Sequence, residues 1–231
     1  MPGLARIAAA RRPLRALRPV PTALAAAAWL ALTPAQATDY FWTAGNFASG
    51  VTAPNPLPSG DALFGQSGTN NKNFSGVSFV NQGSVVWQTT DRIGFVSSAV
   101  TNSALWDLQA DANLTYAGGS VSGFANDGTF RKSGGAGTST IGNNIAFVNS
   151  GVIDVQAGTV DFAGGSATFQ AGTQFAGAGV VRISGSAGFV GGFTSANLLL
   201  AGGTFSGDNT TPATQSGSVR WTGGAFGGAR Q

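Results

Sequence analysis

Apolar and polar residues alternate at a period of two along most of the chain after residue 37. Clusters of Gly, Asn, Ser and Thr interrupt these runs every 6–12 residues. Such alternation between turn residues predicts short β-strands. The stretch that comes closest to an amphipathic helix is 104–112, and it is not a convincing one. The alternating apolar pairs are Val77/Phe79, Val85/Trp87, Leu114/Tyr116, Ile145/Phe147, Ile153/Val155, Val160/Phe162, Val181/Ile183, Leu198/Leu200 and Val219/Trp221.

A repeated phrase distinguishes among the all-β folds. FANDGT at 124–129 recurs as FVNSGV at 147–152, 23 residues later, and FVNQGS at 79–84 is a third copy 45 residues upstream. A fixed period in this range is typical of stacked repeats and has no cause in a sandwich or barrel. The sequence therefore predicts a right-handed parallel β-helix of about 20–24 residues per coil. The apolar residue before the turn is expected at Phe79, Val100, Phe124, Phe147, Phe169 and Phe189.

The phrase also predicts a role for each of its residues. The Phe should point into the coil and stack on the Phe of the next coil. The Asn should lie at a corner, where it can bond the equivalent Asn and tolerates left-handed backbone angles. The following Gly should take a turn conformation that a β-carbon would obstruct. The predicted structural ladder, which is not a ligand site, consists of Phe79, Asn81, Phe124, Asn126, Phe147 and Asn149.

The first 37 residues read as a targeting segment. Residues 1–18 hold five Arg and no acid, 22–32 are apolar, and Ala35-Gln36-Ala37 has the form of a cleavage site. This order predicts a helical secretory signal peptide, too short to span a bilayer, with a mitochondrial-type presequence as the alternative. The expected domains are this signal at 1–37, an N-terminal capping segment at 38–75 and β-helix repeats at 76–231. The expected location is extracellular or at the cell surface, with the periplasm in transit.

The residue composition after position 37 limits the kinds of partner and active site that the chain can have. After residue 37 there are seven Lys or Arg and nine Asp, so the net charge is −2 and gives no indication of nucleic acid as a partner. Cys, His and Glu are absent there, which excludes a nucleophile–His pair and the usual zinc sites, and no cofactor is expected. GGAGTS at 134–139 is similar to a calcium nonapeptide but has Ser139 in place of the Asp.

Charged pairs leave an enzymatic alternative open. Asp107/Asp111 and Asp154/Asp161 are the nearest carboxylate pairs, and glycoside hydrolysis needs two carboxylates about 5–10 Å apart. A solvated face is the favoured interpretation of both pairs. Arg131-Lys132 beside Asp127 is the densest charged spot, interpreted as a surface patch with polyanion contact as a minor alternative. Trp42, Trp87, Trp106 and Trp221 would stack on sugars if exposed, although packing is their commoner use.

Residues 124–165, FANDGTFRKSGGAGTSTIGNNIAFVNSGVIDVQAGTVDFAGG, resemble exported bacterial β-helix proteins of the autotransporter-passenger and filamentous-haemagglutinin-like kind. Segments 40–46 and 58–65 resemble the cap of these passengers. The resemblance implies an adhesin whose partners are glycans or host cell-surface components, with the membrane involved only through export or a missing translocator. Autotransporters end in a membrane barrel, whereas 221–231 reads like the opening of another coil. A fragment of a larger adhesin is therefore a further alternative.

We accordingly expect an exported structural or adhesive protein that makes many weak contacts along its side. The alternative is a carbohydrate-active β-helix enzyme that uses one of the two Asp pairs. The expected protein is not an enzyme, and the sequence does not predict its oligomeric state.

Overall fold

The structure is a computed structural model that describes residues 36–48, 52–68, 72–164, 167–208 and 210–227. The predicted signal peptide falls outside these residues apart from its last two positions. The described residues after Gln36 belong to one unit. Its regular elements are β-strands, and within the described ranges no helix is long and apolar enough to cross a bilayer.

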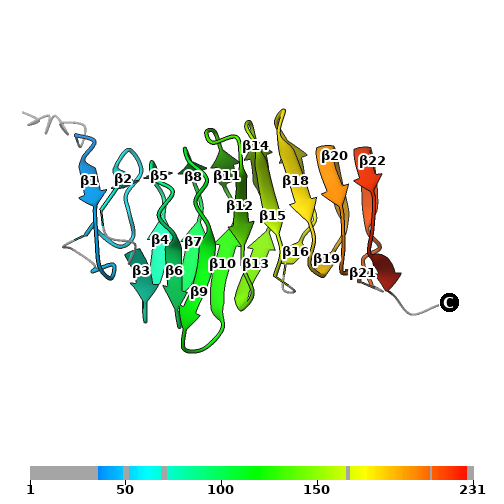
Figure 1. Cartoon of the computed structure of the whole chain (residues 1–231), viewed down its shortest axis with the longest axis horizontal. Coiled ribbons are helices and arrows are strands. Elements are labelled where there is room, and N and C mark those ends of the chain that lie inside the picture. Colours follow the sequence, from blue (N-terminus) through cyan, green and yellow to red (C-terminus); the bar gives the residue numbers. More distant parts are fainter. Residues whose placement is uncertain (1–35, 49–51, 69–71, 165–166, 209, 228–231) are drawn as a thin grey trace, which may run out of the picture. The chain divides into compact units, whose positions relative to one another are not determined.

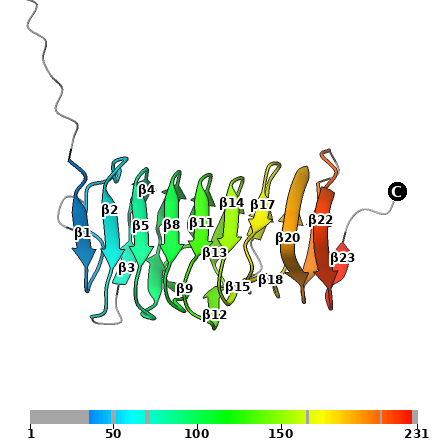
Figure 2. The same cartoon turned by 90° about the horizontal axis from the view of Figure 1, so that it is seen from above.

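The chain winds as a parallel β-solenoid, as predicted. Most coils give one short strand to each of three faces, and the strand pairings within the described ranges are all parallel (Figure 1 and Figure 2). Paired residues lie 20–24 apart through most of the stack, with 27 between Leu114 and Ile141 and 17 between Val181 and Leu198. The coil length expected from the repeated phrase is therefore found, with local departures.

The strands divide among the faces as follows. The first face holds β1 (Asp39–Trp42), β2 (Ala62–Gly65), β5 (Ser84–Trp87), β8 (Leu105–Leu108), β11 (Thr129–Lys132), β14 (Val152–Val155) and β17 (Gln174–Ala176). The second face holds β4 (Ser78–Asn81), β7 (Ala99–Asn102), β10 (Ser122–Asn126), β13 (Ile145–Asn149), β16 (Ala167–Phe169), β19 (Ala187–Phe189), β21 (Thr204–Gly207) and β23 (Ala225–Gly227). The third face holds β3 (Lys72–Ser75), β6 (Ile93–Val96), β9 (Leu114–Gly118), β12 (Thr138–Ile141), β15 (Thr159–Phe162) and β18 (Val180–Ile183). The longer strands β20 (Gly192–Leu200) and β22 (Thr214–Trp221) run from the first face onto the third.

The core is the column of side chains that point into the coils. On the second face Phe79 lies opposite Val100, Val100 opposite Phe124, and Phe124 opposite Phe147. The rings of Phe124 and Phe147 are stacked, with centroids 5.1 Å apart and planes 7° from parallel. All four side chains are at most 1% exposed. Because strands alternate inward and outward residues, these apolar members of the period-two pattern are each buried on their neighbour in the next coil.

The expected place of Phe169 and Phe189 is wrong by two residues. Ala167 lies opposite Phe147, and Phe169 lies opposite Asn149. Phe189 follows Phe169 in the same column. A shift of two residues keeps the side chain inside, so the aromatic residue moves into the column of the asparagines instead of continuing that of the phenylalanines.

The first coil closes the N-terminal end of the core. Its inward side chains Trp42, Phe47 and Leu57 are 2%, 4% and 0% exposed. The backbone N–H groups of Phe47 and Leu57 both donate to the following coil at 2.8 Å. Residues 38–75, expected as a cap, supply β1, β2 and β3 to the same stack.

Replacing Phe124 by Ala should destabilise the protein by about 3–5 kcal/mol, because it removes a ring packed between two coils and leaves a cavity. The measurement is the midpoint of urea unfolding. Thr101→Ala, on the outward side of the same face, is the control and should stay within about 0.5 kcal/mol of the wild type. Equal effects of the two substitutions would contradict the inward column.

Candidate functional site: an asparagine ladder and paired carboxylates

The asparagines of the repeated phrase form one buried hydrogen-bonded column. Asn81 donates its Nδ2 to Oδ1 of Asn102, Asn102 donates to Asn126, and Asn126 donates to Asn149, each at 2.6 Å. All four are 0% exposed. The column ends where Asn149 Nδ2 donates to Thr173 Oγ1 at 3.0 Å. Asn102, in a copy of the phrase without Phe, supplies the step between Asn81 and Asn126.

Each amide in this ladder also satisfies its second N–H. Asn81, Asn102 and Asn126 donate to the carbonyl oxygens of Leu105, Thr129 and Val152 at 2.8, 3.1 and 3.2 Å. A buried amide costs free energy only when it is left unpaired, so the column is a stabilising element with no free group for a ligand.

The asparagines and the glycine of the repeated phrase do not depend on a left-handed backbone. None of Asn81, Asn126 and Asn149 has a positive φ, so hydrogen bonding accounts for them and left-handed backbone does not. Gly151 is required by close approach, since a Cβ there would lie 2.1 Å from the carbonyl oxygen of Gly128.

The first carboxylate pair is divided between two cations. Asp107 points outward from β8 and accepts from Arg131 Nη2 at 3.0 Å, with the Asp107 side chain 3% exposed. Asp111 lies in the turn after β8 and accepts from Lys132 Nζ at 2.6 Å. Each carboxylate is thus held by a different residue of the next coil.

The second pair lies on two faces of the solenoid. Asp154 on β14 accepts from Gln156 Nε2 at 2.8 Å. Asp161 on β15 accepts from Arg182 Nη2 at 2.7 Å and from Ser184 Oγ at 2.9 Å. The hydrogen bond to Asp161 raises the pKa of the Arg182 guanidinium. Asp161 is thus a partner in an ion pair, Asp154 accepts from a neutral amide, and the alternative of a polysaccharide-active site gains no support from these contacts.

The prediction that Arg131-Lys132 is a surface patch is wrong for the lysine. Arg131 is on the surface with its side chain 30% exposed, whereas Lys132 is 0% exposed and lies between Leu108 and Val155 in an inward column. Its Nζ donates to Asp111 Oδ1 and to the carbonyl oxygen of Gly134, both at 2.6 Å. Burial of the ammonium is possible because these oxygens replace its hydration.

Lys72 repeats this arrangement nearer the N-terminus. Its side chain is 0% exposed and its Nζ lies 2.6 Å from Asp91 Oδ2. The ammonium is also 5.7 Å from the centroid of the Trp87 ring. Sequence analysis missed both lysines as internal residues. The alternation of apolar and polar residues could have identified Lys132, because this lysine occupies a strand position at which the alternation predicts an inward, apolar side chain.

The glycine-rich segment after β11 is wound around the Lys132–Asp111 pair. The Gly137 N–H lies 3.1 Å from both carboxylate oxygens of Asp111. A Cβ at Gly135, where φ is +76°, would lie 2.2 Å from Asp111 Oδ1. Across the described ranges no group of three His, Cys, Asp or Glu residues could hold a metal ion. The cation in this loop is the lysine ammonium.

The hydrogen bond from Lys132 holds the pKa of Asp111 below its ordinary value of 3.8, and the Gly137 N–H adds to this effect. Desolvation acts in the opposite direction and is outweighed. The folded chain therefore keeps this carboxylate ionised at pH values where the unfolded chain binds a proton.

Of the tryptophans singled out for sugar stacking, three are in the core. Trp42, Trp87 and Trp106 are at most 2% exposed, and Trp221 is 58% exposed. Only Trp221 among these four presents most of its side chain to solvent.

Charge separates the three faces. The eight strands of the second face contain no Asp, Glu, Lys or Arg, whereas ion pairs lie on the first and third faces.

No protein-family model matches the chain, and neither the curated proteins nor the solved structures gave a match.

Asn126→Ala removes the acceptor of the Asn102 side-chain N–H and the donor to the side-chain Oδ1 of Asn149. Because each of these buried groups then lacks its partner, the protein should be destabilised by about 1–3 kcal/mol for each. Chemical unfolding measures the loss. Asn143→Ala, at an exposed turn position, is the matched control. A ladder variant no less stable than this control would contradict the structural role of the column.

Stability should fall in acid because of Asp111. Above its ordinary pKa of 3.8 the stabilisation is fully present, and it is lost as the pH falls through the lower pKa of the folded state. Asp111→Asn should be less stable than the wild type at neutral pH and should lose less on acidification, as measured by unfolding midpoints across pH. Asn143→Ala, an exposed change that alters no ionisable group, should run parallel to the wild-type curve. Parallel curves for wild type and Asp111→Asn would refute the linkage.

Proposed function

We propose that this chain is an exported β-helical protein of the cell surface or the secreted fraction, and that it adheres to glycans or other cell-surface components along its second face. The observation that carries the proposal is the uncharged outer side of that face, repeated from coil to coil. Successive strands of a parallel sheet are about 4.8 Å apart, so equivalent side chains form regular rows.

The outward residues of the second face suit many weak contacts. Thr101, Ala125, Val148 and Thr168 follow one another in register on four consecutive strands. All four are uncharged and small, and the hydroxyl groups of Thr101 and Thr168 can donate to or accept from a sugar or a peptide group. No ion must be desolvated when such a surface is covered, which keeps the cost of each contact low. Affinity would then come from avidity over several coils.

The ion pairs on the other faces support the same choice. Asp107 and Asp161 are each nine-tenths buried beneath an arginine of the next coil. Their charges are directed at Arg131 and Arg182 and are less available to a partner. The face without charge is therefore the better contact surface.

The double variant Ala125→Glu/Val148→Glu should weaken attachment to cells or immobilised glycans by at least about tenfold, since two carboxylates would interrupt a multivalent surface. Binding of the labelled chain to cells and to a glycan array measures this. Thr138→Glu/Thr159→Glu, two outward neighbours on the third face, is the matched control and should bind like the wild type. Equal losses in both variants would contradict the choice of face, and a wild type that attaches to nothing would remove the adhesive function.

A further inference from the structure

The second face carries no cation on any of its eight strands. The six Lys and Arg residues of the described ranges lie inside the coils or on the other two faces. Arg182 and Arg220 belong to one outward row of the third face, with Leu199 between them. The other four are Lys72 on β3, Arg92 directly before β6, and Arg131 and Lys132 on β11. An anionic group placed on the second face therefore meets no side chain of opposite charge.

Four of these six cations are also paired with carboxylates of a neighbouring coil. The distances between nitrogen and oxygen are 2.6–3.0 Å, and the pairs are Lys72–Asp91, Arg131–Asp107, Lys132–Asp111 and Arg182–Asp161. A polyanion that reached the first or third face would have to compete with these aspartates for their partners. The paired cations thus add little positive field around the second face.

The turns that flank the eight strands of the second face carry negative charge. Within the described residues, Asp127 directly after β10 and Asp208 directly after β21 are the charged side chains of these turns. Asp127 is exposed and accepts from Ser150 Oγ at 2.8 Å. The N–H and the hydroxyl of Thr210 both donate to Asp208 and hold the pKa of its carboxyl below the ordinary value of 3.8. Asp208 therefore keeps its negative charge in mild acid.

These two carboxylates are too far apart to form a site for a cation. The strands β10 and β21 are separated by four strand spacings, which is about 19 Å. This distance is about twice the Debye length of roughly 8 Å at physiological salt. Asp127 and Asp208 therefore act as two separate points of repulsion for an anionic partner.

Covering the second face with an anionic polymer would cost free energy. A carboxylate or sulfate group that leaves water needs an opposite charge or several hydrogen bonds in exchange. Thr101 and Thr168 each offer one hydroxyl hydrogen, which suits a sugar hydroxyl but does not neutralise an anion. Like charge at Asp127 and Asp208 adds to the cost. A neutral glycan meets none of these penalties.

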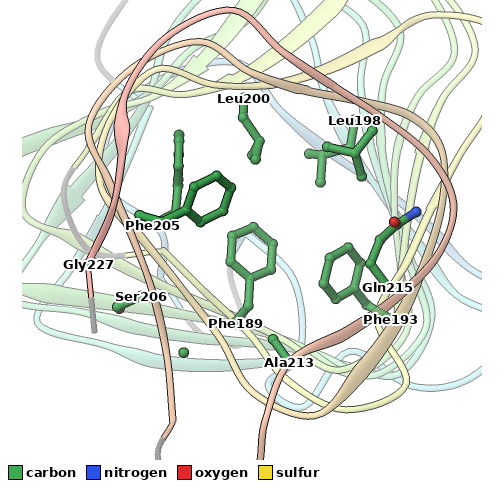
Figure 3. A pocket seen from close by; sticks show the side chains of 12 residues that line it. Phe189, Phe193, Leu198, Leu200, Phe205, Ser206, Ala213, Gln215 and Gly227 are labelled. Carbon is green, nitrogen blue, oxygen red and sulfur yellow. The ribbon is translucent and has the colours of Figure 1, made fainter. Parts of the chain in front are cut away.

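The hollow inside the last coil is not an alternative site for such a ligand. Its volume is about 360 Å³, and Figure 3 shows Phe189, Phe205 and Leu200 directed into it. These buried apolar side chains offer a hydroxyl-rich sugar no hydrogen-bond partners. The charge of the ligand is therefore selected on the second face.

We propose that the partner of the second face is an electrically neutral polysaccharide, and that sialylated, sulfated and uronic acid polymers are excluded from this face. The inference rests on the proposed adhesion to glycans and names the class of glycan. The exclusion comes from the placement of charge, because the cations lie elsewhere and the flanking turns are negative. Since no ion pair forms in such a complex, its affinity should not depend on ionic strength.

The first test is a glycan array of matched pairs, in which each neutral glycan stands beside its sialylated, sulfated or uronate form. The labelled chain should bind the neutral member of a pair at least about tenfold more tightly than the anionic member, because the anion is desolvated without a partner. Binding to the neutral member should stay constant between about 0.05 and 0.5 M salt.

The second test adds cations to the face. Thr101→Lys/Thr168→Lys should strengthen binding to the anionic members by at least about tenfold, and this gain should shrink as salt is raised. Thr138→Lys/Thr159→Lys, the same change in two outward neighbours of the third face, should leave the preference for neutral glycans unchanged. Circular dichroism checks that each variant is folded.

The outcomes separate this inference from the adhesive function. Equal or stronger binding of the wild type to the anionic members would overturn the inference and leave adhesion to glycans in place. A third-face variant that gains as much as the second-face variant would also overturn it, because ligand charge would then not be selected on the second face. Binding to no member of the array would remove the adhesive function, and the inference with it.

Discussion

Stacking in register is the constraint on which the rest of this structure depends. Each inward side chain rests on the residue at the same position of the next coil, so its size and polarity must suit that neighbour. An asparagine can be buried here because another asparagine accepts its N–H, as Asn126 does for Asn102. The column of amides ends where Asn149 donates to the hydroxyl of Thr173, and Phe169 and Phe189 continue the strand register of Asn149 in the following coils.

Buried charge follows the same constraint. Lys132 lies between Leu108 and Val155, where its stem packs like an aliphatic side chain and its ammonium reaches the corner of the preceding coil. The Asp111 carboxylate accepts from it there, and the carbonyl oxygen of Gly134, two residues after the lysine, is the second acceptor. An isolated ammonium in this core would be strongly unfavourable, so the glycine-rich corner is needed as much as the carboxylate. The pair ties two coils together at a turn where no strand pairing is available.

The repeat was readable from sequence because a solenoid converts spatial neighbours into a fixed separation along the chain. Phe124 and Phe147, or Asn126 and Asn149, sit in identical phrases and are stacked partners. The register around Phe169 was not readable, since Phe147 and Phe169 differ by 22 residues, an ordinary coil length, and a shift of two preserves the inward side. The place of Lys132 was also missed, because its carboxylate comes from 21 residues upstream and lysine in a strand usually indicates solvent.

The three faces of the solenoid differ in how they carry charge. Backbone groups are paired between strands, and on the first and third faces the carboxylates of Asp107 and Asp161 are paired with arginines of the next coil. The strands of the second face carry no Asp, Glu, Lys or Arg, so the spacing of about 4.8 Å between coils repeats uncharged groups there. Stacking in register therefore decides the polarity of the outer surface as well as that of the core, because outward residues are aligned between coils in the same way as inward ones.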